Sequence, residues 1–436
     1  MRVLIDAALY AIEVAMLMDE KSLDSIDQAK EAALRVLLHN ARGPFQGLPR
    51  AAGWGYPEPY TRDLMISALG FLATGNEELA DALRRTLLAL ATNQTPHGLV
   101  PSLAHDPADR GASDTTPLFL FGLALYRKSA NQPEFLNEAA QNALKWMQYQ
   151  SPDDMVMVSQ LPTSDWRDEQ WVMGYGLYVN TLVYAYLLLY GDHESAGRVR
   201  ELMNRLEVLG EAKNPHEHEG LVVPSKPYYA LYSYKLFNSD RFDLLGNSLA
   251  ILTGIASPHR ARNLVAWIEA ECDAMRDRGE LAVDLPPCLF PYILRHDPDW
   301  RARYERFNRP GEYHNGGVWP FVSGFYVAAC VAAGRMGLAK RKLLALIELV
   351  KPWHENEAEW GFNEWIKAQT GQPSGRDWQT WSAAMYLYAA ECVRQQRTPF
   401  FDEMRAGDQG GTGTGDDGAI PAPFIREETL SKLPEE

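Results

Sequence analysis

The stretch GLYVNTLVYAYLLLYGDHESAGRVRELMNRLEVL, residues 176–209, contains two helical segments of opposite character. The first, 176–191, is apolar on nearly every side, so a helix formed from it must be covered by neighbours all round. The second, 193–209, places apolar and charged residues at helical spacing and needs cover on one face only. Together they predict an inner helix that is followed, after a short turn, by an outer helix.

The same alternation extends through the rest of the chain. Charged, one-faced segments lie at 22–41, 76–94, 133–150, 193–209, 258–277 and 337–352, and apolar or small-residue segments lie at 62–75, 115–129, 176–191, 244–257, 317–335 and 379–395. Six segments of each type in strict alternation predict an all-α (α/α)6 barrel, a toroid with inner and outer rings of six helices. We expect residues 1–404 to form this single catalytic domain and the Gly- and Asp-rich residues 405–436 to form a flexible tail.

Composition excludes several classes of partner. The chain has a net charge of −15 and a pI near 5.2, which argues against nucleic acid and anionic membrane surfaces. The apolar N-terminal stretch is interrupted by Asp6 and Glu13, so it predicts a helix and neither a signal peptide nor a membrane span. A cytoplasmic protein is the expectation, and assembly into a homo-oligomer is left open.

Metal and cofactor signatures are weak. The four cysteines are scattered and form no CxxC pair, which predicts free thiols. His216 and His218 could chelate a metal, but an exposed polar loop is the simpler interpretation. The sequence contains no GxSxG or Walker motif, so we expect neither a metal nor a cofactor.

Links from outer to inner segments are long, and long loops inside a compact domain are usually functional. They gather aromatic residues and carboxylates at one mouth of the toroid, which suits a sugar: apolar ring faces stack on it, and paired carboxyl groups can cleave its glycosidic bond. The aromatic residues are Trp54, Tyr56, Tyr60, Trp166, Trp171, Tyr228, Tyr229, Tyr313, Trp319, Trp360, Trp365 and Trp378. The candidate acids are Asp63, Asp114, Asp165, Asp168, Glu312 and Glu364. For Asp63 and Asp114, helix capping or a favourable helix dipole is an equally good explanation.

Four blocks of the sequence resemble the alkaline/neutral invertases, glycoside hydrolase family 100. They are YTRDLMISALGFL, RFDLLGNSLAILTGIASP, YHNGGVWPFVSGFYVAACVAAGR and DWQTWSAAMYLYA, in the family's order. The resemblance implies an (α/α)6 barrel and an inverting mechanism without metal or cofactor. Family 63 and the amylo-α-1,6-glucosidase-like glycosidases share this architecture.

The resemblance also selects two of the six acids. WRDEQWVMGYG is similar to the family's acid-bearing stretch, which implies that Asp168 is the general acid, and GFNEWIKAQTG is similar to its base-bearing stretch, which implies that Glu364 is the general base. Inversion then requires the two carboxyl groups to lie roughly 6.5 to 9.5 Å apart. The residues expected to bind substrate are Tyr60, Arg62, Asp63, Asp114, Asp165, Trp166, Arg167, Tyr313, His314, Asn315, Trp319, Trp378 and Gln379.

Departures from the family pattern leave the substrate open. Residues 169–181, EQWVMGYGLYVNT, and 113–121, SDTTPLFLF, differ from the corresponding family stretches. Sucrose is the first expectation for the substrate. Alternatives are glucosylglycerate or mannosylglycerate, with Arg167 or Lys226 holding the anionic group, and the ends of an α-glucan. A sugar-binding or sugar-isomerising toroid without hydrolase activity is the alternative from another class.

Overall fold

A computed structural model describes residues 20–151, 156–205, 221–223, 226–234, 237–351 and 359–407. The predicted segment 1–19, His216 and His218, and tail residues 408–436 lie outside this range. The division into a domain and a tail stays a prediction, although the helix α15 (Phe401–Gly407) crosses the expected boundary.

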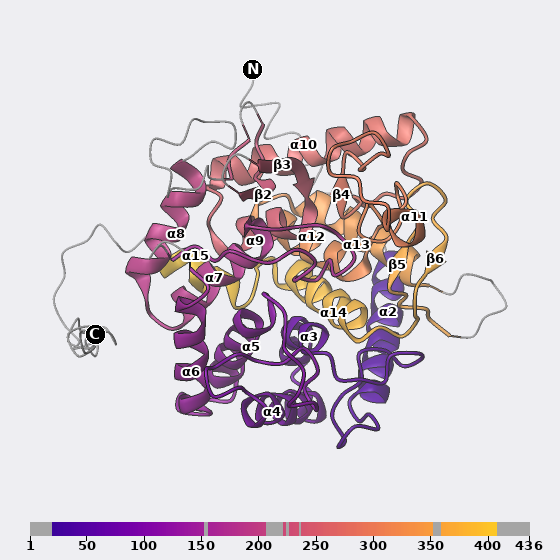
Figure 1. Ribbon diagram of the computed structural model, residues 1–436. Helices are drawn as coiled ribbons and strands as arrows, with labels where there is room; N and C mark the ends of the chain where they lie inside the picture. Colours follow the sequence, from indigo (N-terminus) through magenta and orange to yellow (C-terminus); the bar gives the residue numbers. More distant parts are fainter. Residues whose placement is uncertain are drawn as a thin grey trace.

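The inner ring is a closed circle of helices. It consists of α3 (Thr61–Ala73), α5 (Thr115–Ser129), α7 (Leu177–Leu189), α9 (Leu244–Thr253), α12 (Pro320–Ala332) and α14 (Thr380–Gln395). Each helix packs against the next in this order, and α14 returns to pack against α3 (Figure 1). The predicted (α/α)6 barrel is therefore confirmed.

The outer ring wraps this circle. It consists of α2 (Glu20–Asn40), α4 (Glu77–Thr92), α6 (Asn137–Gln148), α8 (His193–Arg205), α10 (Pro258–Asp277) and α13 (Met336–Val350). In α4 the buried residues are Leu79, Ala82, Leu83, Thr86, Leu87 and Leu90, which form one face of a helix. The opposite face stays in water, as the one-faced pattern predicts.

Small residues allow the inner helices to approach closely. A Cβ atom on Gly70 of α3 would lie 2.2 Å from the carbonyl oxygen of Ala384 in α14, and one on Gly324 of α12 would lie 2.7 Å from that of Met385. Both distances are shorter than real contacts, so larger side chains would force the ring apart. This explains why the inner segments are rich in small residues as well as apolar ones.

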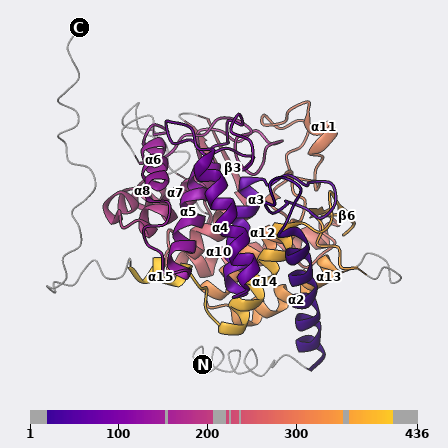
Figure 2. The same cartoon turned by 90° about the horizontal axis from the view of Figure 1, so that it is seen from below.

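The N-terminal ends of the inner helices meet at one end of the barrel. At this end Arg62 of α3 pairs with Asp114 before α5, and the ring of Trp319 before α12 contacts that of Trp381 in α14. Helix α15 lies at the opposite end, where Phe401 stacks on Phe121 (Figure 2). Six helix N-termini therefore face one mouth, and their partial positive charges favour carboxylates there.

The long loops at the mouth contain short strands that periodicity did not predict. The strands β1 (Tyr175–Gly176), β2 (Ala230–Tyr234), β3 (Phe237–Asp243) and β4 (Leu289–Phe290) form an antiparallel sheet in that order. A second hairpin joins β5 (Trp365–Ile366) to β6 (Pro373–Ser374), and the helical turn α11 (Tyr304–Phe307) lies beside the mouth. These strands depend on partners distant in sequence, so local pattern alone could not reveal them.

Two other features bear on expectations from the sequence. All four cysteines are buried free thiols. Over the part of the chain that is described, no helix combines the length and apolar character needed to cross a membrane.

Candidate active site

Three carboxyl groups come together at the mouth from separate segments. They belong to Asp63 in the first turn of α3, Asp168 in the loop before β1, and Glu364 before β5. Burial raises the pKa of Asp63 to about 7; the Arg62 guanidinium opposes this shift, and the charges of Glu364 and Asp168 add to it. Because the charges of both Glu364 and Asp168 act on Asp63, the three carboxyl groups lie close enough to share one site.

Glu364 is recessed in the wall of the site, with an exposed fraction of 6%. Burial raises its pKa to about 7, a hydrogen bond from the Arg376 backbone opposes the shift, and the Asp168 charge adds to it. That bond joins Arg376 N to Glu364 Oε2 at 3.1 Å, and Glu364 N donates to the Arg376 carbonyl at 2.8 Å. Gly375, with a φ of +74°, makes room, because a Cβ there would meet the Glu364 carboxyl group at 2.3 Å.

Asp168 lies in a more open position. Its side chain is exposed to solvent, yet surrounding protein raises the pKa by desolvation, and the Arg62 charge only partly opposes the shift. An exposed carboxyl group that is also desolvated is expected on the wall of a recess, because water reaches it from one side only. The site therefore has an open side at Asp168 and a closed side at Glu364.

Tyrosines line the space between the two carboxyl groups. Burial raises the pKa of Tyr313 above its ordinary value, and the charges of Asp168 and Glu364 raise it further, so this phenol lies close to both. Burial raises the pKa of Tyr56, and the charge of Glu364 raises it further. The Arg376 guanidinium lies 5.9 Å from the centre of the Tyr56 ring. Tyr60 completes the row next to Asp63. Arg376 was not predicted, and Tyr56 was noted among the loop aromatic residues but not among those expected to bind substrate, because only the fold brings both residues to Glu364.

Three bulky residues around Glu364 have left-handed backbone conformations. The φ angles are +46° at Tyr313, +42° at Phe362 and +54° at Trp378. Such angles cost free energy for residues with a side chain and tend to cluster where function dictates the geometry. Trp378 is held there by a 2.9 Å hydrogen bond from its Nε1 to the Trp360 carbonyl. The surrounding contacts therefore impose the shape of this wall.

Asp114 pairs with arginine instead of capping its helix. It occupies the N-cap position of α5 but makes no side-chain capping bond there. Its Oδ1 accepts from Arg62 Nη2 at 3.0 Å. Burial raises the pKa of Asp114, and the Arg62 charge opposes the shift. Between the two interpretations left open by the sequence, the structure thus favours a polar role in the site.

A second buried ion cluster lies behind Asp168. Arg167 Nη2 lies 2.8 Å from Asp165 Oδ2, and Arg167 Nη1 lies 3.1 Å from Asp243 Oδ2. Burial opposes ionisation of Asp165, but the Arg167 charge and its hydrogen bonds outweigh it, so the pKa of Asp165 lies below the ordinary value. Since Arg167 is 1% exposed, this guanidinium holds the loop together and is not free at the surface. Asp243 was not predicted.

Aromatic rings form the floor of the site. His314 stacks on Tyr313 with ring centres 4.0 Å apart and on Trp319 at 5.4 Å, and Trp166 meets it edge-on at 5.2 Å. Burial lowers the pKa of His314 well below its ordinary value, so the imidazole is neutral. Trp166 and Trp319 are almost completely buried. They support the site from below.

The remaining predicted residues have supporting positions or lie elsewhere. Asn315 is buried and joins two loops through bonds to Ile293 and to the Asn308 carbonyl, while Gln379 is buried at the start of α14. Glu312 lies 3.6 Å from Lys367. Among the aromatic residues noted in the loops, Tyr228 and Tyr229 pack towards α10 and α8 and do not join the site. Within the described residues, no group of three metal-binding side chains is arranged to hold an ion.

Comparison with known proteins connects part of the chain to a family. Residues 236–396 match the model for alkaline and neutral invertases. The match includes Glu364 but not Asp168. Probable alkaline/neutral invertase D of Arabidopsis thaliana is 33% identical over 155 residues, which cover 34% of this chain and 26% of that protein. Cytosolic invertase 1 of Oryza sativa subsp. japonica is 32% identical over 155 residues, which cover 34% and 25%. The chain thus spans about a quarter of the length of these relatives.

Solved structures match over most of the chain. A GH63 mannosylglycerate hydrolase from Thermus thermophilus, in complex with Tris and D-glycerate, has a TM-score of 0.58 at 17% identity and covers 82% of this chain and 99% of its own. A wild-type glycosidase has a TM-score of 0.60 at 13% identity and covers 87% and 100%. At these identities the matches show the fold, which is the (α/α)6 barrel of such proteins. The resemblance to alkaline and neutral invertases is confirmed over residues 236–396.

Proposed function

We propose that this protein hydrolyses a small α-linked glycoside with inversion of the anomeric configuration. The observation that carries the proposal is the pair of desolvated carboxyl groups, Asp168 and Glu364. The charges of both groups raise the pKa of the Tyr313 phenol, so both lie close to it. Glycoside hydrolysis needs one carboxyl group that is protonated and one that is ionised. A pair that shares one proton satisfies this need, because each negative charge disfavours the other.

The difference in exposure supports the roles that we propose for the two carboxyl groups. Asp168 lies on the open side and would protonate the glycosidic oxygen, so that the leaving group departs towards solvent. Glu364 is recessed and would remove a proton from a water molecule on the opposite face of the sugar. Asp63 and Arg62, beside them, would hold hydroxyl groups of the sugar ring, and Tyr56 and Tyr60 would contact its faces.

Sucrose is the substrate that we put first. Arg167, which the sequence offered as a partner for an anionic group, is buried between Asp165 and Asp243. The other candidate, Lys226, lies 5.7 Å from the ring centre of Trp267 on α10. Because Arg167 is enclosed by carboxylates and Lys226 lies beside α10, neither of these two cations supports an anionic substrate, and we put a neutral glycoside before glucosylglycerate or mannosylglycerate. We place the reaction in the cytoplasm, with neither a nucleic acid nor a membrane as partner.

A panel of substrates tests the proposal. The protein is incubated with sucrose, glucosylglycerate, mannosylglycerate, trehalose and maltose, and the released sugar is followed by NMR. We expect hexose from sucrose, with the β-anomer appearing first, because water attacks from the face opposite the leaving group. An α-anomer as first product would exclude inversion. If no glycoside is cleaved but a sugar raises the melting temperature, the binding-protein alternative is favoured.

The pH profile gives an independent check. We expect kcat/KM to rise with pH as Glu364 loses its proton, with a midpoint near its pKa of about 7. The value falls at higher pH as the remaining carboxyl proton of the site is lost, and this second limb belongs to the coupled pair and not to Asp168 alone. The measurement is kcat/KM on the best substrate across the pH range in buffers of constant ionic strength. An acid limb at the ordinary pKa of glutamate would contradict the assignment of Glu364 as a desolvated base.

A further inference from the structure

Asp168 belongs to a loop whose position depends on a distant segment. We call residues 165–171 the acid loop and residues 297–308 the bracing segment. The Asp168 side chain is exposed to solvent, so its direction depends on the backbone of the residues on either side. Arg167, which precedes it, is fixed by its two ion pairs. The bracing segment fixes the residues that follow it.

Asn308 is the central contact of the bracing segment. Its Nδ2 donates to the carbonyl oxygen of Glu169, the residue after Asp168, at 2.7 Å. Its Oδ1 accepts from His314 N at 2.9 Å. The side chain is completely buried. One neutral amide therefore ties the acid loop to the segment that carries Tyr313, the phenol close to both catalytic carboxyl groups.

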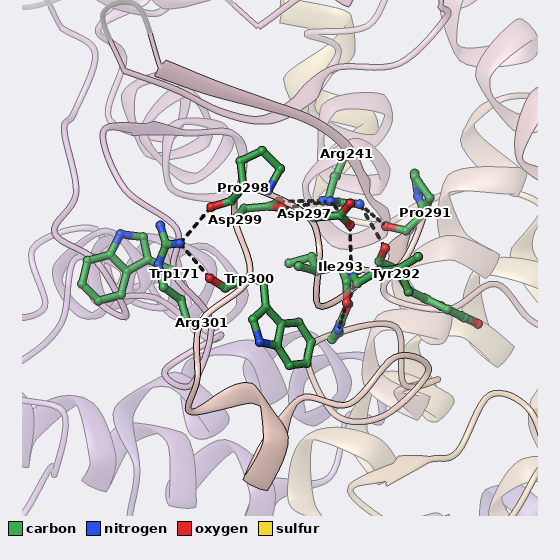
Figure 3. Close-up of polar contacts among 12 residues, drawn as sticks. Trp171, Arg241, Pro291, Tyr292, Ile293, Asp297, Pro298, Asp299, Trp300 and Arg301 are labelled. Carbon is green, nitrogen blue, oxygen red and sulfur yellow. Dashed lines mark hydrogen bonds and ion pairs between the residues drawn. The ribbon is translucent and has the colours of Figure 1, made fainter.

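Tyr304 fixes the far end of the acid loop. Its hydroxyl oxygen accepts from Trp171 N at 2.8 Å. The Arg301 guanidinium lies 5.3 Å from the centre of the Trp171 ring, and Figure 3 shows the two side chains next to each other. Arg303 forms an ion pair with the Glu169 carboxylate. The two residues of the acid loop that flank Gln170 are thus held from one side.

The bracing segment is itself anchored to the sheet. Arg241 of β3 lies 2.8 Å from Asp297 Oδ2 and 2.7 Å from Asp299 Oδ2, and it also donates to the Pro291 carbonyl at 2.9 Å (Figure 3). A guanidinium that makes several bonds in fixed directions gives a rigid junction. The bracing segment is fixed by Arg241 and cannot shift to compensate for a lost contact. A change at Asn308 or Tyr304 would therefore move the acid loop.

We propose that Asn308 and Tyr304 are positioning residues that orient Asp168 for proton donation. The inference rests on the proposed function, since it assumes that Asp168 is the general acid. Proton transfer requires the acid within hydrogen-bond reach of the glycosidic oxygen, and small displacements cost large factors in rate. Neither residue touches the sugar in this proposal; both act through the backbone of the acid loop.

Dependence on the leaving group separates this role from a general structural one. The variants are Tyr304→Phe and Asn308→Ser, and the substrates are the best glycoside and the glycosyl fluoride of the same sugar. Fluoride leaves with little help from an acid, whereas a sugar alkoxide needs a proton. We expect kcat on the glycoside to fall about tenfold or more, with kcat on the fluoride and both KM values within about threefold of the wild type. The variant Asp168→Asn should show the same selectivity to a larger degree.

Tyr388→Phe is the matched control. It also removes a buried tyrosine hydroxyl that bonds to backbone, here the Pro399 carbonyl at 2.7 Å, but in the second half of α14. We expect it to lower neither rate. Equal losses on both substrates in Tyr304→Phe and Asn308→Ser, or no loss on either, would overturn the positioning role. Failure of the wild type to cleave any glycoside or fluoride would instead overturn the proposed function itself.

Discussion

Asp168→Asn and Glu364→Gln are each expected to lower kcat on the best glycoside by about a thousandfold or more, because general acid and general base catalysis contribute roughly 10² to 10⁴ each. Both changes keep the size of the side chain and remove only its capacity to exchange a proton. The measurement is the initial rate of hexose release at saturating substrate. Asp168→Asn should retain much more activity on the glycosyl fluoride, whereas Glu364→Gln should lose activity on both substrates, since every substrate needs the activated water.

Folding controls exclude a trivial cause of this loss. In the native state the pKa of Glu364 lies at about 7, above the ordinary value of 4.5, so the folded protein binds more protons than the unfolded chain between these values. This group therefore disfavours folding as pH rises, and Glu364→Gln should melt no lower than the wild type at about pH 8. Glu312→Gln, which changes a carboxylate paired with Lys367, should alter kcat less than about threefold. A thousandfold loss in Glu312→Gln would contradict the selection of Glu364.

Arg167→Met is expected to destabilise the fold by about 3–5 kcal/mol, the largest effect on stability that we anticipate, because it leaves Asp165 and Asp243 buried without a counter-charge. The measurement is the free energy of unfolding from urea titrations. Unpaired buried carboxyl groups have raised pKa values in the folded state, so the variant should lose stability further as pH rises from about 5 to about 8. A loss that does not depend on pH would point to lost packing instead of charge.

Two further variants separate charge from packing. Combining Arg167→Met with Asp165→Asn and Asp243→Asn removes all three charges, and we expect it to recover much of the stability lost in the single variant. Arg394→Met removes an arginine that pairs with Glu391 on the surface, and we expect no measurable change, because water screens such pairs. If the triple variant is no more stable than Arg167→Met, the uncompensated charges are not the cause of the loss.

Local sequence patterns predict most of the barrel. Segments such as 176–191 are apolar on every side and can fold only between other helices. Segments such as α4 have one apolar face and one polar face that is exposed to solvent. Their strict alternation predicted both rings. The strands β2 and β3 escaped prediction because a short strand is stable only when its partner is present, and periodicity within a loop does not identify that partner.

For the site, sequence chemistry supplied six acids, and the family resemblance selected two. It could not distinguish capping from pairing at Asp114, since both need a carboxylate before a helix. It also missed Asp243 and Arg376, and it did not select Tyr56 from the loop aromatic residues, because the relevance of these residues arises only when distant loops meet.

The sequence by itself determined the number, order and type of the twelve helices in the two rings, because covering an apolar surface is a property of each segment. Only the tertiary structure decided which carboxyl groups share a site, since their pKa values depend on burial and on charges that arrive from other loops. It also decided that Arg167 is enclosed between Asp165 and Asp243, and that residues 297–308 hold the loop of Asp168. Such contacts join segments far apart in the chain, and no local pattern encodes them.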